Sequence, residues 1–390
     1  MQWVEIEADE DRYSRLRMIP WWDQEVLARA RVMVIGAGAL GNEIIKNLAL
    51  LGAGQVLVVD FDFVETSNLS RSVLFRSEDE SRSKATAACE SARRINSDCR
   101  FFALHADVTR DVGLGVFRWA DVVICGLDSR EARLAVNRAC WKVTRPWVDG
   151  ATEAVQGIAR TFLPPDGVCY ECTLGEHDRR IMAARDSCGF LAREAYRRGG
   201  TPTTPTTSAV IAGIEVQEAV KILHRDAQLP KLVGKGFFFD GLGYDCFTID
   251  YFRREDCLSH ETYESIVESD LAAETATLAD VRAAAAPHVG EGATIELPSE
   301  MVTALRCSRC GSSETFFQLV RSVGADAVRC PDCGSERVPD VAVECAPGAP
   351  FDSIPLARLG FGIMDILQVR SGGHAVQIEV SADARKVFAD

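Results

Sequence analysis

The sequence lacks three features that would point to particular classes of protein: an excess of basic charge, a long apolar segment and a low-complexity tract. It holds 43 Lys and Arg residues against 57 Asp and Glu. The resulting net charge of −14 argues against a nucleic-acid partner, whose phosphates favour a basic face. Asn42, Glu43 and Lys46 interrupt the most apolar stretch, so no membrane span is predicted. The start of the chain is acidic and lacks the apolar core of a signal peptide. We therefore expect a cytoplasmic protein without a nucleic-acid or membrane partner.

Cysteine, in contrast, is plentiful, with fourteen residues. In a reducing compartment, Cys-x-x-Cys pairs more often hold a metal than form disulfides. Two such pairs lie close together near the C-terminus, Cys307 with Cys310 and Cys330 with Cys333, and each pair is followed by Gly. This is the spacing of a zinc ribbon, whose knuckle turns favour glycine. A module that begins near residue 301 has little core, so we expect the metal to contribute most of its folding energy.

Strands and helices alternate through the first part of the chain. Short apolar runs predict buried parallel strands at 32–35, 55–60, 101–104 and 122–125, with helices at 40–51, 84–95 and 130–141 between and after them. Residues 10–30 are also expected to be helical. From about residue 146 the pattern becomes rich in strands, interrupted by one long helix from Ser208 to His224 that Thr206 or Thr207 would cap. The predicted fold class is α/β: a doubly wound, Rossmann-like, mostly parallel sheet with an antiparallel extension, plus a small zinc-ribbon module.

A glycine-rich loop follows the first predicted strand. Gly36, Gly38 and Gly41 lie between that strand and a helix, where the backbone can approach a phosphate and the helix N-terminus supplies N–H groups. Asp60 closes the second strand, where a carboxylate can bind ribose hydroxyls. These features alone predict a nucleotide site, and a nicotinamide-dependent oxidoreductase would share them.

The following segments are more specific. DFDFVETSNLSRSVLF, SRSKATAA and VICGLDSREARLAVN are followed by DGATEAVQGIARTFLPPDGVCYECTL and PTTSAVIAGIEVQEAVKIL. Over about residues 10–260 the chain resembles the adenylation domain of ubiquitin-like-protein activating enzymes. That domain is shared with the adenylyltransferases that activate sulfur carriers in molybdopterin and thiamine synthesis. The resemblance implies that ATP and Mg²⁺ are cofactors and that a small ubiquitin-like or sulfur-carrier protein is the partner.

The resemblance also implies roles for individual residues. Asp60 would hold the ribose, Asn68, Arg71 and Lys84 would engage the phosphates, and Asp128 would position Mg²⁺; Asp62 belongs to the same nucleotide-binding set. Arg15 matches an arginine that reaches into the ATP site of a neighbouring subunit, so we expect a homodimer. One position departs from the family: Ser72 stands where glutamine commonly follows Arg71.

Two further expectations follow from the resemblance. Cys169 and Cys172 match a first metal knuckle, and Cys257 with His260 stands where relatives have a second Cys-x-x-Cys pair. Both this set and the ribbon would be structural Zn²⁺ sites, because four protein ligands leave no open position. Cys188 lies in the loop that carries the thioester-forming thiol of ubiquitin-type enzymes.

We divide the chain into an adenylation domain at 1–262 with a crossover loop at about 173–205, a helical connector at 263–300 and the ribbon module at 301–390. The main interpretation is an activating enzyme that forms an acyl-adenylate and then a thioester on Cys188, which a conjugating enzyme could receive. The alternative is a sulfur-carrier adenylyltransferase that forms no enzyme thioester. An oxidoreductase leaves Asn68, Arg71, Lys84 and Asp128 without a purpose, and a non-catalytic scaffold would not need the ATP residues.

Overall fold

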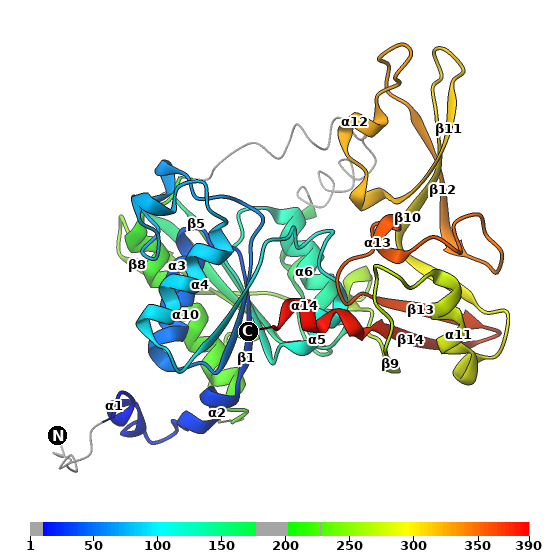
Figure 1. Cartoon of the computed structure of the whole chain (residues 1–390). Helices are drawn as coiled ribbons and strands as arrows, with labels where there is room; N and C mark the ends of the chain where they lie inside the picture. Colours follow the sequence, from blue (N-terminus) through cyan, green and yellow to red (C-terminus); the bar gives the residue numbers. More distant parts are fainter. Residues whose placement is uncertain (1–10, 177–201, 227, 390) are drawn as a thin grey trace.

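An eight-stranded sheet forms the centre of the first domain (Figure 1). The structure is a computed structural model that describes residues 11–176, 202–226 and 228–389. The strand order is β3-β2-β1-β4-β5-β6-β7-β8, with parallel pairs from β3 to β5 and antiparallel pairs from β5 to β8. The strands are β1 (Arg31–Ile35), β2 (Gln55–Val59), β3 (Arg100–Leu104), β4 (Val122–Cys125), β5 (Trp147–Glu153), β6 (Gln156–Phe162), β7 (Lys235–Asp240) and β8 (Asp245–Asp250). The predicted parallel sheet with an antiparallel extension is confirmed.

Helices cover both faces of this sheet, which explains why its central strands are apolar throughout. One face packs against α3 (Ala39–Leu51), α4 (Lys84–Ile95) and α10 (Pro205–Leu223), and the other against α5 (Leu114–Trp119) and α6 (Arg130–Lys142). Gly52, with φ of +78°, ends α3 in the left-handed conformation that favours glycine. The cap of α10 differs from the expected one: its first residue is Pro205, so Thr204 is the residue that caps it.

The N-terminal segment forms two short helices where the sequence predicted one. These are α1 (Ser14–Arg17) and α2 (Gln24–Arg29), and Pro20 lies between them. Proline disfavours helical geometry at the residue before it and cannot donate the backbone hydrogen bond of a helix interior. Asp23 then caps α2 by accepting from the Glu25 N–H. The prediction of one amphipathic helix over residues 10–30 is therefore wrong.

The C-terminal part contains a second sheet with its own helix. Its strands are β9 (Ile266–Ser269), β10 (Thr294–Arg306), β11 (Ser313–Leu319), β12 (Val338–Cys345), β13 (Ile366–Ser371) and β14 (His374–Val380), and α11 (Leu278–Val289) packs on it. The order is β11-β10-β13-β14-β9, and β12 pairs with β10. Short helices complete the described structure: α7 (Tyr170–Thr173), α12 (Ala325–Val328), α13 (Leu356–Leu359), α14 (Ala384–Val387), η1 (Thr66–Asn68), η2 (Ser77–Asp79), η3 (Leu258–His260), η4 (Val320–Ser322) and η5 (Ser381–Asp383).

This second sheet changes two expectations. Residues 263–300 were expected to form a helical connector, but only α11 is helical, and β9 and the first half of β10 belong to the sheet. The expectation of a module with little core is also wrong. A cluster of buried apolar side chains, among them Leu278, Ile295 and Phe351, fills the space between α11 and the sheet. The segment with the second cysteine set is thus one end of a larger module, from which β11 and β12 project (Figure 1).

The second module packs directly against the first domain. Backbone hydrogen bonds join Gly113 N–H to Ile363 O at 2.9 Å and Gly115 N–H to Met364 O at 2.8 Å. The chain then returns through α14, which lies beside α5 (Figure 1). The ring of Phe388 stacks on Trp119 with centroids 4.3 Å apart. The two parts therefore share one apolar core at this junction. Within the described ranges, no helix combines the length and the apolar character needed to cross a membrane.

Candidate active site and metal centres

The glycine-rich loop is held in a shape that other residues could not adopt. Gly36 has φ of +92°, and a Cβ placed on it would lie 2.5 Å from the Gly126 carbonyl oxygen. A Cβ on Gly41 would lie 1.9 Å from the Gly36 oxygen, whereas one on Gly38 would meet nothing within 4 Å. Gly36 and Gly41 are therefore needed to close the loop against the segment that follows β4, and Gly38 leaves the loop open towards a ligand.

Asn42 and Gly126 support this loop, and the sequence did not indicate either residue. The Asn42 Nδ2 donates to the Ala37 and Gly38 carbonyl oxygens at 2.7 and 3.0 Å, and its Oδ1 accepts from the Leu74 N–H at 2.9 Å. This buried amide joins the loop to the segment that carries the predicted phosphate-binding residues. A small residue at position 126 follows from the parallel register of β1 and β4, which the sequence alone does not give.

Asp60 lies beside the loop at the end of β2. Its Oδ2 accepts from the Ala37 N–H at 2.7 Å, and its Oδ1 accepts from the Asp62 N–H, also at 2.7 Å. Burial raises the pKa of Asp60, while the Ala37 hydrogen bond and the charge of Lys84 lower it. Asp62, whose N–H binds Asp60, also pairs with Lys84 through its side chain and so links the lysine to Asp60.

Lys84 and Asp62 form an ion pair at the start of α4. The Nζ–Oδ2 distance is 2.8 Å, and the Lys84 side chain is 12% exposed whereas that of Asp62 is 51% exposed. The Lys84 N–H also donates to the Asp62 carbonyl oxygen at 3.0 Å. The loop between them is therefore closed at its base, and Asp62 links the lysine to Asp60, which binds the glycine-rich loop.

Asn68 and Arg71 lie within this closed loop and bind its backbone. The Asn68 Oδ1 accepts from the Glu65 N–H at 3.0 Å, and the Arg71 Nη1 donates to the Ser67 carbonyl oxygen at 2.6 Å. Ser72, which departs from the family pattern, is buried. Because its side chain is short and buried, Ser72 cannot reach a ligand as the longer side chain of glutamine would.

Asp128 follows β4, the strand next to the glycine-rich loop. The Gly126 N–H donates to the Ile35 carbonyl oxygen at 2.9 Å, so the segment after β4 begins beside the loop. Asp128 is exposed, and Ser129 caps α6 directly after it by accepting from the Ala132 N–H at 3.3 Å. One exposed carboxylate beside the glycine-rich loop is compatible with a Mg²⁺ ion, which commonly takes one or two carboxylates together with substrate phosphates.

Arg15 lies far from the glycine-rich loop of its own chain. The neighbouring Tyr13 hydroxyl accepts from Asn96 Nδ2 at 2.7 Å, and the Tyr13 ring lies against Gly52 at the C-terminal end of α3. Because α3 has 13 residues, this end is about 20 Å from the helix N-terminus at the loop. The structure therefore separates Arg15 from the other predicted site residues. Cys188 lies outside the described residues.

The first predicted metal set comes together across the ends of α7 and η3. The ligand atoms of Cys169, Cys172, Cys257 and His260 all lie within 4.8 Å of one another. The Cys169–Cys172 and Cys169–Cys257 sulfur separations are 3.6 and 3.5 Å, close to the edge of about 3.8 Å expected for tetrahedral zinc thiolates. The His260 ring lies on Trp141, with centroids 4.4 Å apart, which fixes its orientation. A Cys₃His zinc site is compatible with this geometry.

The second predicted metal set forms two matching turns at the far end of the C-terminal module. The ligand atoms of Cys307, Cys310, Cys330 and Cys333 lie within 4.8 Å of one another. In each turn a glycine N–H donates at 2.9 Å to the carbonyl oxygen of the first cysteine, Gly311 to Cys307 and Gly334 to Cys330. Both glycines have positive φ, +75° and +70°. The arrangement is compatible with a zinc ribbon.

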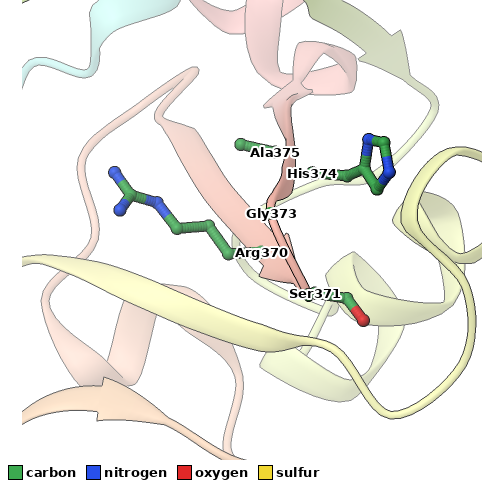
Figure 2. A pocket seen from close by; sticks show the side chains of 6 residues that line it. Arg370, Ser371, Gly373, His374 and Ala375 are labelled. Atoms are coloured by element: carbon green, nitrogen blue, oxygen red, sulfur yellow. The ribbon is translucent and has the colours of Figure 1, made fainter.

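A hollow of about 520 Å³ at the turn between β13 and β14 does not resemble an active site. Figure 2 shows the Arg370 side chain on one side of the strand pair and Ser371 and His374 on the other, so the polar groups do not converge. Arg370 is also paired with Glu296 at 2.9 Å. The converging groups lie instead at the carboxyl edge of the first sheet, around the glycine-rich loop.

Comparison with protein-family models identifies the family to which this chain belongs. The model described as "ThiF family" matches residues 11–259, which is most of the first domain. The chain belongs to the ThiF family. The predicted resemblance to activating enzymes and sulfur-carrier adenylyltransferases is thereby confirmed, because named members of the family include both kinds of protein.

Three relatives illustrate this range. The chain is 32% identical over 256 residues to the SAMP-activating enzyme E1 of Haloferax volcanii, covering 63% of this chain and 87% of that protein. It is 36% identical over 231 residues to the sulfur carrier protein adenylyltransferase of Thermus thermophilus, covering 57% and 80%. It is 35% identical over 191 residues to the NEDD8-activating enzyme E1 catalytic subunit of Caenorhabditis elegans, but spans only 44% of each chain.

Solved structures share the fold of this ThiF-family chain. The E. coli MccB structure with ATP has a TM-score of 0.54 at 20% identity, and the alignment covers 65% of this chain and 74% of MccB. At this identity the likeness extends to the fold alone. It covers the mixed α/β part, in agreement with the predicted doubly wound sheet.

Proposed function

We propose that this ThiF-family chain is an ATP-dependent enzyme that adenylates the C-terminal glycine of a small ubiquitin-like or sulfur-carrier protein. The observation that carries this proposal is the gathering of the glycine-rich loop, Asp60, Lys84 and Asp128 at one edge of the sheet. The relatives support it, because they include a SAMP-activating enzyme and a sulfur carrier protein adenylyltransferase. MccB, which shares the fold, has been solved with ATP.

The reaction brings two anions together. A carboxylate oxygen of the partner attacks the α-phosphorus of ATP, the bond to the bridging oxygen breaks, and pyrophosphate leaves with the electron pair. Lys84 and Arg71 supply positive charge near the phosphates, and the loop N–H groups add the positive end of α3. Asp60 would orient the ribose, with Asp62 holding Lys84. Asp128 would hold Mg²⁺, which offsets phosphate charge.

The position of Arg15 favours a homodimer. The segment that carries Arg15 lies at the C-terminal end of α3, and the glycine-rich loop lies at the other end, about 20 Å away along the helix, so Arg15 is not placed to contact nucleotide bound by its own chain. A second copy could bring its Arg15 to this site, as the family resemblance implies. Mixing Arg15→Ala with Lys84→Ala protein should then restore part of the activity, since one site of the mixed dimer keeps both residues.

The second half of the proposal is a thioester on Cys188. The Cys188 thiolate would attack the adenylate carbonyl and AMP would leave, after which a conjugating enzyme could accept the activated protein. The alternative is that the chain is a sulfur-carrier adenylyltransferase, in which a sulfur donor consumes the adenylate directly and no enzyme thioester forms. Its support is the 36% identity to such a protein over 80% of that relative's length.

One experiment separates these possibilities. The full-length chain is mixed with ATP, Mg²⁺ and each candidate small protein ending in glycine, and pyrophosphate exchange and covalent adducts are measured separately. Asp128→Ala should abolish exchange, whereas Cys188→Ala should keep exchange and lose a reductant-sensitive adduct. Exchange at the wild-type rate in Asp128→Ala would overturn the adenylation proposal. Exchange without any adduct in the wild type would favour the sulfur-carrier alternative.

A further inference from the structure

A buried ion pair lies directly behind the segment that carries Asp128. Arg133 on α6 and Asp149 on β5 are 7% and 0% exposed at their side chains, and their Nε and Oδ1 atoms are 2.8 Å apart. The other oxygen of Asp149 accepts from Arg160 Nε at 3.1 Å. A buried ion pair is often no more stable than an apolar replacement, because both charges lose their hydration. Its presence at this position therefore calls for a role other than stability.

The remaining hydrogen bonds of Arg133 indicate that role. Its Nη2 donates to the Leu127 carbonyl oxygen and, at 3.1 Å, to the Gly150 carbonyl oxygen. The Leu127 carbonyl belongs to the peptide bond that precedes Asp128. Arg133 thus joins this peptide to the end of β5 on one side, while Ser129 fixes the other side of Asp128 through its cap on α6.

The geometry needs a guanidinium and not simply a positive charge. Arg133 serves three acceptors on two different elements: a carboxylate on β5, a carbonyl on β5 and a carbonyl in the loop. The planar guanidinium has N–H donors in fixed directions and can bind all three acceptors at once. A lysine ammonium is a compact charge at the end of a flexible side chain and cannot reproduce this geometry. Arg133 therefore ties the loop that carries Asp128 to β5 through hydrogen bonds to both.

We propose that Arg133, held by Asp149, is a positioning residue that orients the Asp128 carboxylate towards the metal ion of a metal–nucleotide complex. This rests on the proposed role of Asp128 in adenylation. Groups that orient a metal-binding side chain typically change metal affinity by about 10- to 100-fold when they are substituted. A purely structural Arg133 would instead change the stability of the protein without a specific effect on metal-dependent binding.

The test compares ATP binding with Mg²⁺ and with EDTA, measured by calorimetry on the full-length chain. Arg133→Lys and Arg133→Met should weaken Mg²⁺-dependent binding by about tenfold or more and leave binding in EDTA unchanged. Arg138→Met is the matched control, because Arg138 lies on the same helix but is 48% exposed. Melting temperatures without nucleotide identify a variant that is simply unfolded.

A double-mutant cycle with Asp128→Asn keeps the proposal falsifiable. If Arg133 acts through Asp128, Arg133→Lys should have no further effect on Mg²⁺-dependent binding once Asp128 is Asn. Additive losses, or equal losses in Mg²⁺ and EDTA, would overturn the positioning role. If Asp128→Asn alone leaves the Mg²⁺ dependence intact, the proposed role of Asp128 fails, which is a different outcome. Arg133→Lys that binds like the wild type would overturn the inference while leaving the proposed function standing.

Discussion

At the scale of single residues, the least expected feature is Glu215, an acidic side chain sealed inside the first domain. It lies on α10 against Gly150, where a Cβ on the glycine would be 2.3 Å from its Oε2. Neither carboxyl oxygen finds a hydrogen-bond partner among the described residues. Burial, and then the nearby charge of Asp149, raise the pKa of Glu215 well above its ordinary value of 4.5. The folded protein therefore favours the neutral carboxyl.

This raised pKa predicts a particular pH dependence of stability. Between the unfolded pKa of a glutamate and the higher folded one, the native state binds a proton that the unfolded state has lost. The free energy of unfolding then falls as pH rises, by up to about 1.4 kcal/mol per pH unit. Glu215→Gln should remove this loss and raise the melting temperature at pH 8 more than at pH 5. Glu153→Gln, at an exposed position, is the control. Equal effects of Glu215→Gln at both pH values would contradict the prediction.

At the scale of structural elements, the glycine-rich loop shows that glycines in one motif have different duties. Gly41 allows α3 to begin against the Gly36 carbonyl, while a Cβ on Gly38 would meet nothing within 4 Å. Gly41 is therefore needed for packing, whereas Gly38 leaves room for a ligand. Replacing each glycine by alanine in turn separates these two roles.

Gly41→Ala should therefore destabilise the protein by more than about 2 kcal/mol, because its Cβ would meet backbone atoms that cannot move aside. Gly38→Ala should cost less than about 1 kcal/mol, the difference between Gly and Ala before a helix, yet weaken ATP binding. Chemical denaturation measures the first effect and calorimetric titration with ATP the second. A stable Gly41→Ala protein would show that the loop is not packed as described.

The same comparison explains which elements the sequence could predict. Strands β1, β2 and β4 are continuous apolar runs flanked by helical periodicity, so local pattern was sufficient. Strand β9 is four residues long and pairs with β14, far along the chain, so no local signal marks it. Asn42, Gly126 and Arg133 were missed for a related reason, because their roles depend on contacts between elements. The second metal set was visible because its ligand spacing is local within each Cys-x-x-Cys turn, whereas Cys257 and His260 were joined to Cys169 and Cys172 through the family resemblance.

At the scale of the whole molecule, the two cysteine-rich sets lie in different parts of the fold and should be independent. We expect about two zinc ions per chain, one at each set. Cys307→Ser should lose one ion and keep the other, and the C-terminal module should retain its secondary structure because it has an apolar core. Native mass spectrometry counts the ions, circular dichroism follows the fold, and Ser308→Ala is the control. Loss of both ions in Cys307→Ser would show that the sets are coupled.

The junction between the module and the first domain is the second feature at this scale. Trp119 and Phe388 stack with an interplanar angle of 20°, and both lie near Phe102. A double-mutant cycle with Trp119→Ala and Phe388→Ala should give a coupling free energy of about 0.5 to 1.5 kcal/mol in thermal or denaturant unfolding. Additive effects would mean that the stacked rings contribute no direct coupling between the two parts.

The shared core at this junction has a consequence for biosynthesis. The N-terminal part of a chain leaves the ribosome first, and domains can begin to fold while translation continues. Strand β3 and helix α5 emerge long before residues 363–388, which cover Phe102 and Trp119. A nascent first domain would thus present an apolar strip until the last part of the second module arrives. Chaperones bind apolar surfaces of this kind. The edge of the first sheet at β3 is synthesised early, but it is covered only after residues 363–388 have been made.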